Sequence, residues 1–177
     1  MKQFKTATVF VASLAMVTLI GRSSQACAHD GGSHSGGGDY SDEVAPSYPL
    51  AFYDMNVTTP ETMRDFLWVI DSTYDLMIEK GVSARKIKFV VSLRGLSVAF
   101  VTDEFLTYDP VGQEIRGYLD SLMSKGVRIE ACIISCQWVG VAPDTLKDGV
   151  LVIDNAFASS IFYQRRGYAL IPIHQLP

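Results

Sequence analysis

The sequence predicts a three-layer α/β/α domain in which helices cover both faces of a five-stranded, mainly parallel sheet. The first observation behind this prediction is that short apolar segments alternate along the chain with segments of helical periodicity. The second is that the apolar segments are rich in β-branched residues, as in strands that are covered on both faces. The third is that no linker divides the chain after Tyr48, so residues 48–177 are expected to form one domain.

Five segments are expected to form the strands of this sheet. Each is short and apolar, and turn or capping residues bound it. The segments are 49–57, 87–93, 127–133, 150–153 and 168–172. The fourth is too apolar to lie on a surface, whereas Pro172 in the fifth predicts an edge or a strand end, because proline donates no backbone hydrogen bond.

End signals and periodicity define the longer helices. Thr59 is expected to cap the first helix, which has Pro60 at its first position and ends at Gly81. The second, about 112–125, has apolar residues at three- and four-residue spacing.

The third helix, 156–166, follows the capping residue Asn155. Its apolar residues Phe157, Ile161 and Phe162 are expected to face the core. Among the shorter segments, 134–139 is expected to form a helical turn directly after the third strand. Residues 96–101 are either a helix or a loop packed on the sheet, and 102–110 are expected to be irregular.

Residues 1–28 have the pattern of a secretory signal peptide. Two lysines precede an uncharged apolar run, and a small-x-small cleavage site ends at Ala28. We therefore expect cleavage near Ala28 and a mature chain that is periplasmic or secreted, with no membrane span left. A lipid anchor at Cys27 is the minor alternative, because Ser24 stands where lipoprotein signals have an aliphatic residue.

Residues 29–47 are rich in glycine, serine and histidine and have little to bury, so they are expected to be a disordered linker. Loss of residues 1–28, which carry three basic residues and no acid, would change the net charge of −4 to −7. This acidic balance argues against nucleic acid as a partner, because binding to phosphates needs clustered basic residues.

Two cysteines, Cys132 and Cys136, remain after cleavage. Cys132 ends the third strand, and parallel sheets carry their sites at the carboxyl ends of strands. Helix N–H groups there favour a thiolate. The adjacent Ile133-Ile134, and Glu130 on the same face of the strand, would instead raise the pKa of the thiol. The simpler interpretation is that both cysteines are packing residues.

The order of motifs resembles that of the DsrE/DsrF-like family. Its members share a strand that ends in cysteine, a short helix, Gly-Val or Gly-Ile, a Pro-x-x-Leu turn, a Val-rich strand and a closing Gln-x-x-Gly-Tyr-Ala-x-x-x-Pro. Here these motifs are Ala131-Cys132, Gly140-Val141, 143–146, 150–153 and 164–172, the last with two residues in place of three between Ala169 and Pro172. The resemblance extends over residues 49–172.

The resemblance implies a five-stranded parallel sheet and homo-oligomers, commonly trimers or hexamers. It also implies a chemistry, because the sulfur-relay members carry a persulfide on the cysteine that matches Cys132. Cys136, one helical turn later, would then be a resolving thiol or form a local disulfide with Cys132. The chain differs from these members after the cysteine, where a bulky segment that includes Trp138 replaces small residues and Arg-Gly.

Arg94 follows the second strand and is expected on the same edge of the sheet as Cys132. Two interpretations are open. The guanidinium group could bind an anionic ligand, or it could pair with a carboxylate as structural arginines do.

The sequence contains no Ser/His/Asp set, phosphate loop or paired-histidine metal site, and His174 is the only histidine after the linker. It therefore predicts neither a metal centre nor a cofactor. The favoured interpretation is an exported, non-catalytic oligomer that binds a partner or a small sulfur-containing or anionic ligand. The alternative is a thiol-dependent sulfur carrier, sulfurtransferase or redox protein that uses Cys132.

Overall fold

The computed structural model describes residues 48–175. Five strands form one sheet in the order β4-β3-β2-β1-β5, and all four pairings are parallel. The strands are β1 Leu50–Asn56, β2 Lys88–Leu93, β3 Arg128–Cys132, β4 Leu151–Ile153 and β5 Ala169–His174. The expected five-stranded α/β fold is confirmed. The signal peptide and linker expected at 1–28 and 29–47 lie outside the described residues.

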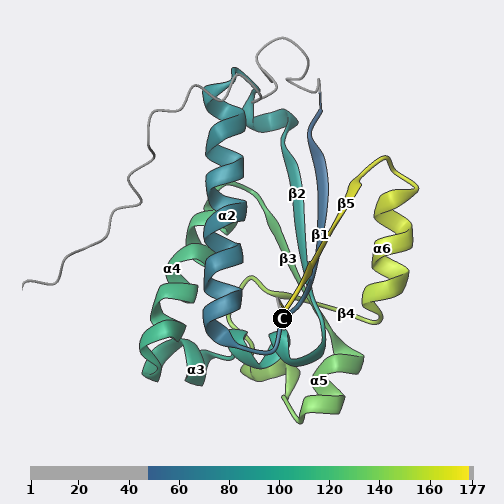
Figure 1. Cartoon of the computed structure of the whole chain (residues 1–177). Helices are drawn as coiled ribbons and strands as arrows, with labels where there is room; N and C mark the ends of the chain where they lie inside the picture. The colour runs from purple at the N-terminus through teal and green to yellow at the C-terminus, as the bar shows by residue number, and fades with distance from the viewer. Residues whose placement is uncertain (1–47, 176–177) are drawn as a thin grey trace, which may run out of the picture. The chain divides into compact units, whose positions relative to one another are not determined.

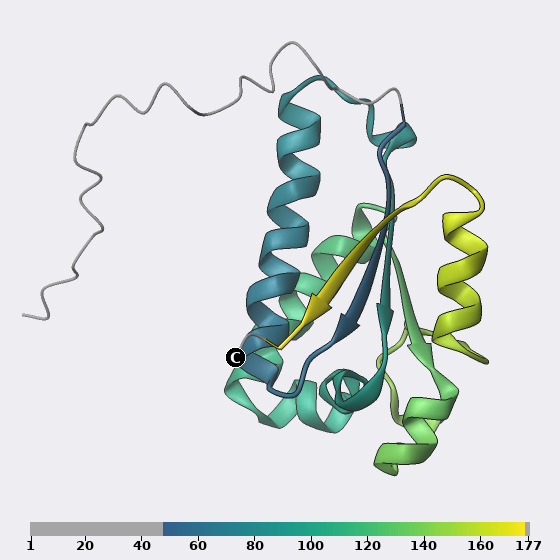
Figure 2. The ribbon, with the colours of Figure 1, turned by 45° about the vertical axis from the view of Figure 1, so that its right-hand side comes forward.

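Helices lie on both sides of the sheet (Figures 1 and 2). On one side are α2 (Pro60–Glu79), α3 (Asp103–Tyr108) and α4 (Pro110–Ser124), and on the other is α6 (Ala156–Gln164). The short α5 (Ile133–Val139) continues directly from β3 at the carboxyl end of the sheet. Short 3-10 helices occupy Ala84–Lys86, Gly95–Val101 and Pro143–Thr145. Within residues 48–175 no helix has the length and hydrophobicity needed to cross a membrane.

The segment 102–110, expected to be irregular, contains the helix α3. Thr102 caps α3 by accepting a hydrogen bond from the Phe105 N–H at 3.4 Å. Asp109 then caps α4, because its Oδ1 accepts from the Val111 N–H at 2.8 Å and Pro110 occupies the first helical position. Two caps thus lie close together, and α3 is too short for its periodicity to show in the sequence.

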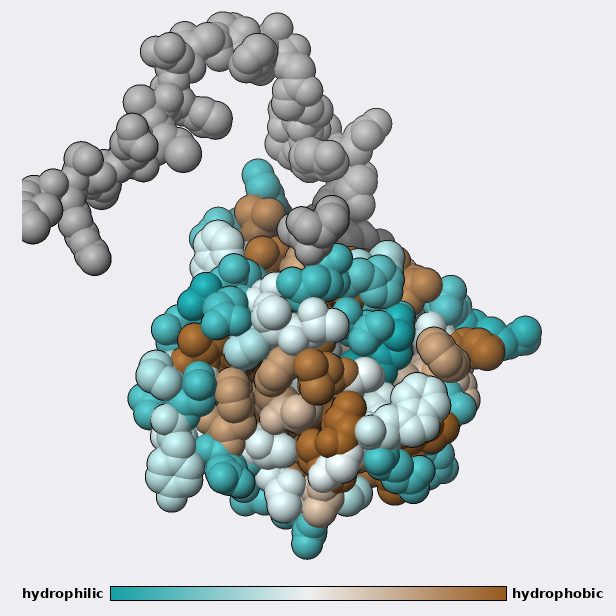
Figure 3. Space-filling model, turned by 60° about the horizontal axis from the view of Figure 1, so that its bottom comes forward, coloured by the Kyte–Doolittle hydropathy of each residue, from teal (hydrophilic) through white to brown (hydrophobic). Residues whose placement is uncertain are grey.

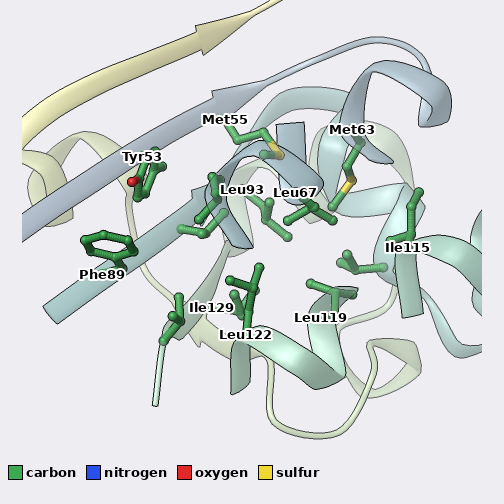
Figure 4. Packing of buried hydrophobic residues seen from close by; sticks show 14 of the residues in the cluster. Tyr53, Met55, Met63, Leu67, Phe89, Leu93, Ile115, Leu119, Leu122 and Ile129 are labelled. Carbon is green, nitrogen blue, oxygen red and sulfur yellow. The ribbon is translucent and has the colours of Figure 1, made fainter. Parts of the chain in front are cut away.

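The main core fills the space between the sheet and the helices α2 and α4 (Figure 4). Alternate residues of β1, β2 and β3 point into it, as the twofold period of a strand requires. Its members include Tyr53, Met55, Met63, Leu67, Phe89, Leu93, Ile115, Leu119, Leu122 and Ile129. On the other face, the apolar contact with α6 is limited to Phe52, Val90 and Tyr163, with Tyr168 beside them.

The orientation expected for the last helix is wrong. Phe157, Ile161 and Phe162 are 65%, 61% and 49% exposed, while Ala156 and Tyr163 are buried. The cause lies in the sheet, because Asp54, Ser92 and Glu130 are side by side on the face that α6 covers. The helix therefore turns polar groups toward this face, and its apolar stripe points outward.

The two edges of the sheet differ from each other. In β4, Leu151 and Val152 are 41% and 42% exposed, so the expectation that this strand does not lie on a surface is also wrong. The other edge is β5, in which Pro172 pairs with Asp54 of β1. This confirms the edge position expected from the proline.

Candidate functional site

Three side chains meet at the carboxyl ends of neighbouring strands. Because Met55, Leu93 and Ala131 are in register on β1, β2 and β3, the residues that follow them, Asn56, Arg94 and Cys132, lie in one row on the α6 side. They line a cavity of about 270 Å³. Its other lining residues are Gly95, Ile134, Ser135, Trp138, Asn155, Ala156 and Phe157.

Figure 3 shows the end of the molecule at which the strands finish, where hydrophobic surface lies in patches among polar surface. Cys132 and Arg94, which were expected on the same edge of the sheet, line the same cavity. The sequence reasoning missed Asn56, Asn155 and Ser135. Asn56 ends β1, Ser135 lies in the first turn of α5 and Asn155 caps α6. The sequence does not show the strand register that brings these three residues together.

The thiol of Cys132 is 5% exposed. Burial raises its pKa, but polar hydrogens close to the sulfur favour the thiolate and outweigh burial, so the pKa lies below the usual value of a cysteine. The backbone N–H groups of Ser135 and Ala156 are the main sources, followed by the Ser135 hydroxyl. Of the two opposing effects expected from the sequence, the lowering of the pKa therefore prevails.

Ser135 connects the end of β2 to the cysteine. Its Oγ accepts a hydrogen bond from the Gly95 N–H at 2.9 Å, so its own hydroxyl hydrogen remains available for the sulfur. Gly95 has φ +59°, and a Cβ built on it would lie 2.3 Å from Oδ1 of Asn56. Only glycine fits at this close approach, and the Gly95 N–H is thereby held against Ser135.

Replacing Ser135 with alanine should slow the alkylation of Cys132 about tenfold at a pH below the midpoint of its titration. The reason is that a hydrogen bond to a charged group contributes about 1.5–3 kcal/mol. Iodoacetamide labelling across a pH series, read by mass spectrometry of the peptide that carries Cys132, measures the effect. Ser121→Ala is the control, since Ser121 bonds Asp71 at 3.0 Å instead. An unchanged rate in Ser135→Ala would exclude this hydrogen bond.

Glu130 does not act on the cysteine as the sequence suggested. Its carboxylate pairs with Arg128 and accepts hydrogen bonds from Ser159 Oγ at 2.6 Å and the Tyr163 hydroxyl at 3.0 Å. Burial, with Glu130 next in importance, raises the pKa of Tyr163 to about 12. The charge of Glu130 is thus offset, and its bonds hold α6 against the sheet.

Arg94 pairs with a carboxylate, as one of the two interpretations expected, while its contact with an anionic ligand stays a prediction. Its Nε and NH2 groups bond the two carboxylate oxygens of Asp54 at 2.7 and 3.0 Å, and its guanidinium lies 5.4 Å from the centre of the Phe157 ring. Three of its five N–H hydrogens remain for a ligand. Its positive charge, however, is offset by Asp54.

Cys136 lies apart from the cavity. It is fully buried in the main core, and burial, followed by the charge of Cys132, raises the pKa of its thiol. Both cysteines are free thiols. The structure thus brings Cys132 and Arg94 together at the cavity, whereas Cys136 does not line it. A role of Cys136 as a resolving thiol stays a prediction.

The fold has counterparts among solved structures. The protein of unknown function MTH1491 from Methanobacterium thermoautotrophicum aligns over 71% of this chain and 98% of its own, with a TM-score of 0.54 and 22% identity. The ychN protein from E. coli aligns over 71% and 99%, with a TM-score of 0.52 and 13% identity. No family model and no curated protein sequence matches the chain. These likenesses concern the fold alone, and through ychN they support a DsrE-like α/β fold.

Proposed function

We propose that this chain is an exported member of the DsrE/DsrF-like family that binds small sulfur compounds and carries a sulfur atom on Cys132. The observation that carries the proposal is the environment of the thiol. Cys132 lines a cavity, and the polar hydrogens of Ser135 and Ala156 lower its pKa. This geometry favours the thiol-dependent alternative over the non-catalytic interpretation, because a packing cysteine needs neither a cavity nor donors aimed at its sulfur.

The proposed reaction is the transfer of one sulfane sulfur atom. The Cys132 thiolate attacks the terminal sulfur of a hydropersulfide R–S–SH, so that a new S–S bond forms as the old one breaks. The products are Cys132–S–SH and the thiolate R–S⁻, which then takes a proton from water. Charge and electrons balance without an oxidant. The donors around Cys132 stabilise the attacking thiolate and, after transfer, the persulfide anion.

A homo-oligomer is the second part of the proposal, and the outward face of α6 supports it. Phe157, Ile161 and Phe162 form an exposed apolar stripe, and Leu151 and Val152 of β4 add to the exposed apolar surface. Contiguous exposed apolar patches commonly mark interaction sites, so this stripe supports an interface. A non-catalytic oligomer that binds a partner through this stripe is the second candidate function.

The proposal that the protein is exported is based on the amino-terminal residues. The signal-peptide pattern that ends at Ala28 supports a periplasmic or secreted location, with cleavage there. The intact mass of the chain purified from its native compartment tests both the cleavage site and the alternative of a lipid on Cys27.

Sulfur loading tests the main proposal. Mature protein incubated with an alkyl hydropersulfide at neutral pH should gain the mass of one sulfur atom on the peptide that carries Cys132. Cys132→Ser should lose this gain, whereas Cys136→Ala should keep it because Cys136 does not line the cavity. Native protein that gains no sulfur, or that loads equally well after Cys132→Ser, would overturn the proposal and leave the binding function.

A further inference from the structure

We propose that the cavity selects uncharged or weakly charged organic persulfides over inorganic dianions such as thiosulfate, and that Asp54 imposes this selection. The inference rests on the proposed function, since it names the class of sulfur donor for the same site. It follows from the charges that surround Cys132 and from the apolar side chains at the mouth of the cavity.

The charges at the site leave no net attraction for a dianion. Among residues 48–175, Arg94 is the only cationic residue that lines the cavity. Both oxygens of Asp54 bond it at 2.7 and 3.0 Å, and the two side chains are only 17% and 19% exposed, so solvent screens the pair little. Once Cys132 is a thiolate, the group formed by Cys132, Arg94 and Asp54 carries one net negative charge.

Glu130 and Arg128, on the neighbouring part of the sheet, do not change this net charge. Glu130 precedes Cys132 on the same face and is paired with Arg128. The whole sequence has a net charge of −4. A dianion that approaches the thiolate is therefore repelled at short range and is not attracted at long range, whereas a donor with one negative charge or none meets much less repulsion.

The apolar lining favours an organic donor. Ile134, Trp138 and Phe157 line the cavity together with the polar groups, and Trp138 and Phe157 are 80% and 65% exposed. Such side chains bind an alkyl or aryl substituent by excluding water from it. Thiosulfate has no apolar part for them to contact. The N–H groups of Arg94 that Asp54 leaves free can still orient a polar group of the donor.

Asp54 sets this preference because it determines whether the charge of Arg94 is available. Asparagine has the same shape and can still accept a hydrogen bond from Arg94, but it offsets no charge. In Asp54→Asn, Arg94 therefore becomes a positive group beside the thiolate, and the net charge of the site changes from one negative charge to zero. A dianion then meets attraction from Arg94 in place of net repulsion.

The experiment compares two donors on the mature chain. Sodium thiosulfate is the dianion, and an alkyl hydropersulfide, which carries at most one negative charge, is the organic donor. In the thiosulfate reaction the Cys132 thiolate takes the outer sulfur, the S–S bond breaks and sulfite leaves. Asp54→Asn should raise the rate of loading from thiosulfate about tenfold relative to the rate from the hydropersulfide. In the native protein, added salt should speed loading from thiosulfate more than loading from the hydropersulfide, because it screens the stronger repulsion of the dianion.

Asp71→Asn is a matched control. Asp71 pairs with Lys125 at 2.9 Å, and these side chains are 17% and 21% exposed, almost as in the Asp54–Arg94 pair. This variant changes the net charge of the chain equally but lies on α2, away from the cavity, so the ratio of the two rates should not change.

Two results would overturn the inference. If both donors load Cys132 and the ratio of their rates is the same in native protein and Asp54→Asn, the selection by charge is wrong while sulfur loading stands. If neither donor loads Cys132, the proposed function and this inference fall together.

Discussion

Replacement of Glu130 with alanine should lower the free energy of unfolding by about 3–5 kcal/mol. The carboxylate is 1% exposed and accepts hydrogen bonds from Ser159 and Tyr163, in addition to its pairing with Arg128. Each hydrogen bond to a charged group contributes about 1.5–3 kcal/mol, and the buried Tyr163 hydroxyl would be left without its partner. Urea denaturation followed by circular dichroism measures the loss.

A second readout separates this network from a general loss of stability. Ser159 and Tyr163 both belong to α6, whose first residue, Ala156, supplies an N–H group to Cys132. Loosening α6 should therefore also slow the alkylation of Cys132 in protein that is still folded. Glu114→Ala is the control, because Glu114 is exposed and its contact with Arg64 is 3.6 Å long. Equal midpoints for Glu130→Ala and native protein would show that α6 is held by other contacts.

Replacement of Ile161 with aspartate should convert the proposed oligomer to monomers while the domain remains folded. Ile161 is 61% exposed in the chain described here, so a charge at this position costs the isolated domain little. In an interface the same charge would be desolvated without a partner, and this costs several kcal/mol per copy. Sedimentation velocity across a range of protein concentrations measures the change.

Trp68→Asp is the control for this prediction. Trp68 is 56% exposed on α2, which lies on the other side of the sheet. It tests whether any exposed apolar side chain has the same effect. Native protein that sediments as a monomer, or an Ile161→Asp variant that keeps the native mass, would contradict an interface on α6.

Local patterns predicted most of the fold. The strands are short apolar runs, and Thr59, Asn155 and Pro60 lie at the helix ends where capping preferences place them. The orientation of α6 could not be predicted in this way. Hydrophobic periodicity finds an apolar stripe on a helix, but whether the stripe faces inward depends on the surface it meets, and here that surface carries Asp54 and Glu130 from strands far apart in the sequence.

The candidate site, like the fold, could be predicted only in part. The rule that parallel strands present functional groups at their carboxyl ends brought Cys132 and Arg94 together. The partner of Arg94 could not be chosen from the sequence, because Asp54 lies 40 residues earlier. The N–H group of Ala156 likewise reaches Cys132 only through the packing of α6. Since such long-range contacts set the charge of the site, the sequence alone left the chemistry of Cys132 open.

The edges of the sheet also limit how copies of this chain can associate. In β5, Pro172 removes one backbone donor, and β4 has only three residues. Neither edge offers an unbroken run of free donors and acceptors on which another strand could add, so growth of the sheet from one molecule to the next is disfavoured. Association through side chains such as those of α6 can close on itself by symmetry, which favours small assemblies of fixed size over fibres.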